Sequence, residues 1–248
     1  MLALIIIALF VLGFFLMSLS SGRLSFRQLF GTIDGEDLLR KDERRPVLYL
    51  RPFDFDEWSS RPRSVEVDGV PGFFSLRTLP APSYEAALAK VVIRVGPRIT
   101  VSNPKSNRRV KGFSTIRLGP HEWQQKVETQ MKKAALVILC AGSDEGITWE
   151  FVKACDVVPR QRLVILTINS TSEEWWQMAE RTLQTRLPRV GSYEPDLMYG
   201  MLYFDKDGNA HSDVIVPVQG NLTKAMTAAF RPVFKQLQEL DNHFPPLA

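Results

Sequence analysis

Four short apolar runs, each followed by a loop and then by a helical pattern, constrain the fold of this chain more than any other feature. The runs are VLYLRPF (47–53), RITVS (98–102), AALVILC (134–140) and LVILTI (163–168). They are rich in Val, Ile and Leu without alternation of apolar and polar residues, which is typical of strands buried on both faces. Because helices separate the runs, we expect an α/β domain with a mostly parallel, doubly wound sheet and helices on both faces.

The helical segments have recognisable ends. Ser83 and Ser172 are the expected N-caps of two helices. Pro120 is a suitable first residue for another helix, which carries Trp123, Val127 and Met131 on one face. A last helix is expected over residues 222–240, and Pro232 should kink it or divide it in two.

Two further local patterns complete the predicted domain. The apolar segments on either side of Asp207-Gly208 predict a β-hairpin with its turn at these two residues. Trp175 and Trp176 are adjacent in a predicted helix, so their side chains should diverge by about 100°. We therefore expect one of these tryptophans in the core and the other at the surface.

The N-terminal segment is almost entirely apolar, and its first charged side chain is Arg23. About 20 apolar residues are long enough to cross the roughly 30 Å hydrocarbon core of a bilayer. Residues 1–22 therefore predict a transmembrane helix that contacts the lipid bilayer through residues 2–21. A cleaved signal peptide is the alternative, although no basic region precedes the apolar segment.

The rest of the chain divides into a linker and a domain. Residues 23–45 are expected to form a membrane-proximal linker with a short helix near residues 37–44, and residues 46–248 to form the α/β domain. Basic residues follow the apolar segment and none precedes it, so the positive-inside tendency places residues 23–248 in the cytoplasm of a single-pass membrane protein.

Composition excludes some classes of protein. With 45% hydrophobic and 23% charged residues, the chain is expected to be globular rather than disordered. A net charge of +4 fits a nucleotide, an RNA or an anionic membrane surface equally well, and a solvated surface is the simplest interpretation. The basic cluster Arg108, Arg109 and Lys111 lacks interleaved aromatic residues, so nucleic acid is not expected as a partner. His121-Glu122 resembles the start of a zinc-protease motif, but Gln125 stands where the second histidine is required. No metal site is predicted.

Polar and aromatic residues gather after the predicted strands. Carboxyl ends of parallel strands lie at one edge of a sheet, where ligands usually bind. The candidate site residues at this edge are Arg51, Phe53, Asp54, Asn103, Lys105, Ser143, Asp144, Trp149 and Glu150. The alternative is that these residues are polar only because loops are solvated.

The segment from Asp144 to Glu150, DEGITWE, followed by Ala154, supplies a resemblance to two enzyme families. It resembles nucleoside 2-deoxyribosyltransferases, in which an Asp, a Gly and a Thr precede the catalytic Glu and an Ala follows it. It is also similar to the Toll/interleukin-1 receptor (TIR) domain, in which the third strand leads to a Trp and a Glu. The TIR-like similarity extends loosely over residues 46–170. Both families have flavodoxin-like sheets.

The resemblance implies cleavage of an N-glycosidic bond, with Glu150 and Asp144 as catalytic residues. Breaking such a bond develops oxocarbenium character at C1′, which the Glu150 carboxylate would stabilise. For an ordinary nucleobase Asp144 or Asp54 would supply a proton, whereas nicotinamide departs without one. The base would stack on Trp149 or Phe53.

The remaining candidates would hold the rest of the substrate. Arg51 and Lys105 are placed to meet phosphates, and Asn103 and Ser143 complete the expected substrate site. No cofactor is expected, because NAD or a related nucleotide would be the substrate.

Two functions therefore stay open. The first is a membrane-anchored TIR-like hydrolase that acts on NAD or a related nucleotide. The second is a non-catalytic TIR-like module that self-associates at the membrane and transmits a signal, as in bacterial defence. The spacing of Glu150, which follows Trp149 directly instead of four residues later, leaves both open. In the second case Glu150 would be a helix-capping or surface glutamate.

Overall fold

The computed structural model describes residues 34–52, 63–64, 80–81, 83–101, 110–119, 122–168, 171–189, 199–215 and 221–240. All of these residues belong to one compact unit that begins at Asp34. The predicted transmembrane helix, residues 1–22, lies outside the described residues. Within the described ranges, every helix is too short or too polar to cross a bilayer.

The described strands form a mostly parallel, seven-stranded sheet in the order β5-β4-β1-β6-β7-β8-β9. The first five strands in this order are mutually parallel; β8 pairs antiparallel with β7, and β9 pairs antiparallel with β8. The strand bounds are β1 Val47–Leu50, β4 Arg98–Val101, β5 Ser114–Ile116, β6 Leu136–Cys140, β7 Leu163–Ile168, β8 Tyr199–Phe204 and β9 Ala210–Ile215. A separate antiparallel pair consists of β2, Arg63–Ser64, and β3, Pro80–Ala81.

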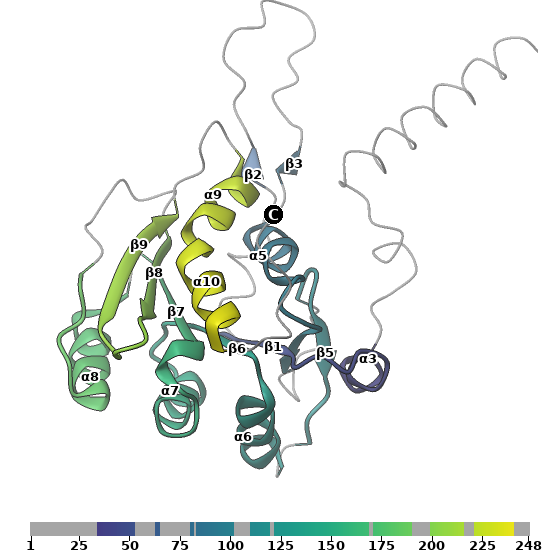
Figure 1. The fold of residues 1–248 in the computed structure, drawn as a ribbon. Helices are drawn as coiled ribbons and strands as arrows, with labels where there is room; N and C mark the ends of the chain where they lie inside the picture. Colours follow the sequence, from purple (N-terminus) through teal and green to yellow (C-terminus); the bar gives the residue numbers. More distant parts are fainter. Residues whose placement is uncertain are drawn as a thin grey trace, which may run out of the picture. The chain divides into compact units, whose positions relative to one another are not determined.

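Helices cover both faces of this sheet, as predicted (Figure 1). One face packs against α5, α9 and α10, and the other against α6, α7 and α8. The helix bounds are α3 Gly35–Lys41, α5 Tyr84–Val92, α6 Trp123–Lys133, α7 Glu145–Val157, α8 Glu173–Leu183, α9 Leu222–Ala229 and α10 Arg231–Leu240, with a 3₁₀ turn η2 at Arg160–Arg162.

Burial on both faces explains the apolar strands. In β1, Val47 and Tyr49 join the core beneath α5, α9 and α10, whereas Leu48 and Leu50 join the core beneath α6 to α8. All four side chains are inaccessible to solvent. A polar residue on either face would therefore be buried, which is why the strand sequence does not alternate.

Two of the predicted helix starts are confirmed, whereas Pro120, the predicted first residue of another helix, lies outside the described residues. The Ser83 hydroxyl accepts a hydrogen bond from the backbone N–H of Ala86 at 3.3 Å, and Ser172 caps α8 in the same way. The last helical segment is divided into α9 and α10, and Pro232 lies in the first turn of α10. Proline has no N–H to donate, and the first turn is the part of a helix where no such donor is required.

The short helix expected in the linker is α3, which begins at Gly35 and ends at Lys41. It packs on β5: a side chain at position 35 would overlap Ile116, and Leu39 packs against the core beneath α6 to α8. Residues from Asp34 onward therefore pack as part of the compact unit.

Candidate functional site

The strand order creates a topological switch point between β1 and β6. From β1 the chain continues to β4 on one side, and it later returns through α6 to β6 on the other side. The loops that follow β1 and β6 thus leave the sheet in opposite directions at its carboxyl edge. This is where α/β sheets bind ligands most often. The loop after β1 begins with Arg51 and Pro52, and the loop after β6 leads to Asp144 and α7.

Glu150 is buried, with only 3% of its surface exposed. It shares the inner face of α7 with Ile147, Phe151 and Ala154, which all belong to the core. Side chains of a helix tilt toward its N-terminus, so Glu150 leans toward the carboxyl edge of the sheet. Its position is neither a helix cap nor a surface site.

Burial also changes the acidity of Glu150. The loss of water and the nearby negative charge of Asp144 raise its pKa to about 8. Among the described residues, no hydrogen bond or ion pair reaches the Glu150 carboxyl group. A carboxyl group in these surroundings holds a proton near neutral pH.

Asp144 caps α7. Its Oδ1 accepts a hydrogen bond from the backbone N–H of Ile147 at 2.9 Å, and its backbone carbonyl accepts one from Thr148. Its Oδ2 is buried and has no hydrogen-bond partner within the described part of the chain. The N-terminus of α7 stabilises negative charge at this position. One oxygen of Asp144 thus holds the helix, while the other is buried without a partner among the described residues.

Arg51 forms a buried ion pair that the sequence did not reveal. Its Nε lies 3.3 Å from Oε1 of Glu85, and the two side chains are 9% and 1% exposed. Oε2 of Glu85 accepts a hydrogen bond from the backbone N–H of Lys111 at 3.4 Å. Arg51, expected to meet a phosphate, therefore also joins β1 to the first turn of α5. The available signal was the position of Glu85, three residues before Leu88 on the buried face of that helix.

Tyr49 and Cys140 lie beside this ion pair on neighbouring strands. The Tyr49 hydroxyl is 3.3 Å from the Cys140 Sγ, and the Tyr49 ring stacks on Phe113. Burial raises the pKa of the Cys140 thiol to about 12, so the thiolate required of a nucleophile is not populated. Cys140 acts as a small core residue.

Ser143 directly precedes Asp144 in the sequence, and Trp149 directly precedes Glu150. The Trp149 ring packs edge to face on Trp123 of α6, with 4.9 Å between ring centroids. Ser143 is exposed in the loop between β6 and α7. The other predicted site residues, Phe53, Asp54, Asn103 and Lys105, lie outside the described residues.

Gly142 allows the loops after β1 and β6 to touch. A methyl group at this position would overlap Cγ of Pro52 and lie 3.0 Å from Cγ2 of Ile147. We expect Gly142→Ala to lower the free energy of unfolding by about 1–3 kcal/mol, because the two loops must separate. Urea denaturation measures this change. Gly119→Ala is the matched control, since its methyl group would meet nothing within 4 Å; equal effects of the two substitutions would contradict the predicted loop contact.

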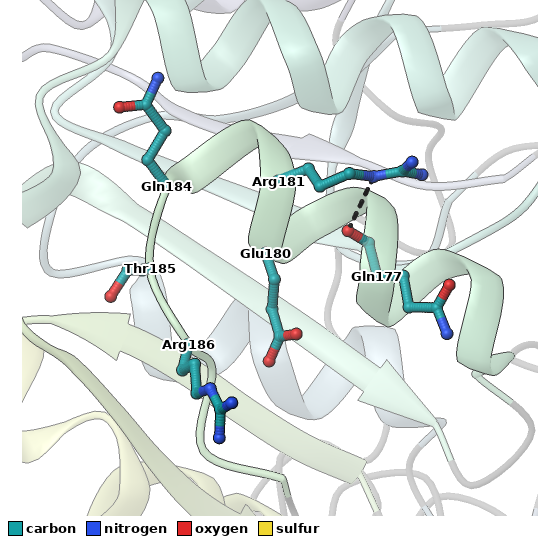
Figure 2. A pocket seen from close by; sticks show the side chains of 6 residues that line it. All are labelled: Gln177, Glu180, Arg181, Gln184, Thr185 and Arg186. Atoms are coloured by element: carbon teal, nitrogen blue, oxygen red, sulfur yellow. Dashed lines mark hydrogen bonds between the residues drawn. The ribbon is translucent and has the colours of Figure 1, made fainter.

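A surface hollow of about 530 Å³ lies elsewhere, at the C-terminal end of α8. Its lining residues are Gln177, Glu180, Arg181, Gln184, Thr185 and Arg186 (Figure 2). Arg181 is already hydrogen bonded to the backbone carbonyl of Gln177 at 3.2 Å. Because α8 runs back from the end of β7, this hollow lies toward the amino edge of the sheet. The hollow is thus separate from the candidate site around Asp144 and Glu150, which lies at the carboxyl edge.

Metal binding has no support in the described ranges, where no three His, Cys, Asp or Glu side chains cluster in a way that could hold an ion.

Comparison with known proteins adds little to this geometry. No family model matches the sequence, and no curated protein matches it. Among solved structures, the C-terminal domain of the coenzyme A biosynthesis bifunctional protein CoaBC is similar at 13% identity, with a TM-score of 0.38. The match covers 80% of this chain and 99% of that domain. Independently of this match, the strand order of the described sheet is compatible with a flavodoxin-like arrangement.

Proposed function

We propose that this protein is a TIR-like N-glycosidase that hydrolyses the glycosidic bond of NAD or a related nucleotide. The supporting observation is the burial of Glu150 beside Asp144 at the carboxyl edge of the sheet, next to the switch point. Buried ionisable groups with a perturbed pKa and a nearby charged group are typical of catalytic sites.

The chemistry of glycosidic cleavage suits this arrangement. The reaction needs negative charge near C1′ as the bond to the base breaks, and some leaving groups also need a proton. Asp144 and Glu150 would provide these two functions. Phe53, Asp54, Asn103 and Lys105 are proposed to complete the substrate site from the neighbouring loops, with Ser143 and Trp149 at its rim.

The proposed cellular setting follows from the N-terminal sequence. Residues 1–22 would anchor the protein in a membrane, with residues 23–248 in the cytoplasm. A TIR-like domain in this setting would act in signalling or bacterial defence, and self-association at the membrane would bring several copies together.

The test is base release by the full chain in a mild non-ionic detergent, with NAD, AMP and IMP as substrates. We expect Glu150→Gln to reduce the rate on at least one of these substrates by about 100-fold or more, as for loss of a positioned acid or base. Glu145→Gln is the control, because Glu145 is exposed in the first turn of the same helix. Absence of base release from all three substrates, with the chain folded, would reject the glycosidase and favour the non-catalytic signalling module.

A further inference from the structure

The two carboxyl groups of the site lie in different surroundings. Asp144 sits at the N-terminus of α7, where Ile147 donates a hydrogen bond to one of its oxygens. Glu150 lies one and a half turns into the helix, 97% buried, and no cation or hydrogen-bond donor of the described residues reaches it. Asp144 therefore has a hydrogen-bond donor for its carboxylate, whereas burial without such a donor penalises negative charge at Glu150.

We infer that Glu150 is the proton donor and Asp144 the anion of the proposed glycosidase, so that its substrate is a nucleoside or nucleotide with a neutral purine or pyrimidine base. This inference rests on the proposed function and reverses the roles that the family resemblance implies. It also separates substrates by chemistry. A neutral base leaves C1′ poorly unless it is protonated, whereas the pyridinium of NAD departs as neutral nicotinamide without a proton.

The proton balance closes with these two residues and water. Glu150 donates its proton to a ring nitrogen of the base as the C1′–N bond breaks and its electron pair moves to the base. Water then attacks C1′, which Asp144 stabilises as an oxocarbenium ion, and the proton of that water passes to Asp144. Transfer of this proton from Asp144 to Glu150 restores the starting state. The products are the free base and ribose, or its phosphate.

The electrostatic surroundings agree with this assignment. Asp144 is the only charged group of the described residues that shifts the pKa of Glu150, and together with burial it raises that pKa to about 8. Ion pairs on or next to α6, α7 and α8 lie near the surface: Lys126 with Glu122, Lys132 and Lys153 with Glu128, Lys153 with Asp156, and Arg189 with Glu173 and Glu180. The Glu150 proton is thus retained until pH rises through about 8.

The test compares two ribosides that differ in whether the leaving group needs an acid. AMP requires protonation of its base, whereas 4-nitrophenyl β-D-ribofuranoside releases a stable anion and does not. For the full chain in detergent, we expect Glu150→Gln to slow AMP cleavage by 100-fold or more and nitrophenyl release by less than 10-fold. Asp144→Asn should slow both reactions by similar factors, and asparagine keeps the helix cap. The wild-type rate on AMP should fall as pH rises through about 8.

Each outcome separates this inference from the proposed function. Faster cleavage of NAD than of AMP, or equal losses on AMP and the nitrophenyl riboside in Glu150→Gln, would overturn the assignment of Glu150 as acid while leaving a glycosidase. Absence of cleavage of every substrate would reject the glycosidase itself and with it the assignment. Glu145→Gln should cleave both ribosides as fast as the wild type. That result would show that loss of an exposed carboxylate from α7 does not by itself slow cleavage.

Discussion

Replacing Glu150 with glutamine is expected to stabilise the fold at alkaline pH and to have a much smaller effect near pH 4. In the folded chain the pKa of Glu150 is about 8, against an ordinary value of 4.5, because burial and Asp144 disfavour the ionised form. The folded state therefore binds the proton more tightly than the unfolded chain does. Stability from this group is complete below about pH 4.5 and is lost as pH rises through about 8.

The expected effect is large. The difference between the two pKa values corresponds to roughly 5 kcal/mol in the free energy of unfolding once pH is well above 8. Glutamine cannot ionise, so in Glu150→Gln the free energy of unfolding should not fall as pH rises through about 8. Any effect of burying the amide group would be the same at every pH. Urea denaturation of the full chain in non-ionic detergent at pH 5, 7 and 9 measures the effect for wild type and variant.

The comparison has a matched control on the same helix. Glu145 is exposed, so Glu145→Gln should change the free energy of unfolding by about 0.5 kcal/mol or less at each pH. If the wild type and Glu150→Gln instead show parallel pH profiles, Glu150 ionises as an ordinary surface carboxyl group, and neither the proposed acid nor its burial is correct.

Much of the fold is predictable from this sequence because its signals are local. Apolar runs without alternation mark β1, β4, β6 and β7, since burial on both faces removes polar residues from them. A serine before a helical pattern marks the start of α5 and of α8, because its hydroxyl accepts a hydrogen bond from a backbone N–H only three residues later. Pro232 marks the division between α9 and α10 for an equally local reason.

Features that depend on distant residues escape such patterns. Trp175 and Trp176 were expected to divide between core and surface, but both are buried, at 4% and 8% exposure. Trp175 packs on Phe151 of α7, and Trp176 is covered by the guanidinium group of Arg189, 4.8 Å from its ring centroid. Since a cation from a later segment covers the second ring, helical spacing alone gives the wrong result.

The candidate site shows the same limit. Sequence identified Asp144 and Glu150, but not that one caps the helix while the other is buried among core side chains. It also identified Arg51 without Glu85. Glu85 and Glu150 both occupy apolar faces of helices, which is a visible signal in each case. Whether such a glutamate is charged depends on a cation from elsewhere in the fold: Arg51 reaches Glu85, and no cation of the described residues reaches Glu150.

This difference makes Glu85 the site of the second large effect on stability. We expect Glu85→Ala to lower the free energy of unfolding by about 3–5 kcal/mol, because it leaves the buried Arg51 guanidinium without the carboxylate 3.3 Å away. The substitution also removes the acceptor for the backbone N–H of Lys111. Thermal and urea denaturation of the full chain at pH 7 both measure the loss. Glu128→Ala is the control, since its ion pair with Lys132 is solvent-exposed and should contribute far less to stability.

Removing both charges distinguishes an electrostatic cost from a loss of packing. In the double variant Arg51→Met/Glu85→Met, apolar side chains replace the ion pair, and buried pairs replaced in this way are often neutral in stability. We therefore expect the double variant to regain most of the stability that Glu85→Ala loses. A double variant as unstable as Glu85→Ala would mean that the stability lost in Glu85→Ala comes from the missing contacts between β1 and α5. The cost of burying the Arg51 charge without Glu85 would then be small. In that case Arg51 would be needed where it stands, with no freedom to meet a substrate phosphate.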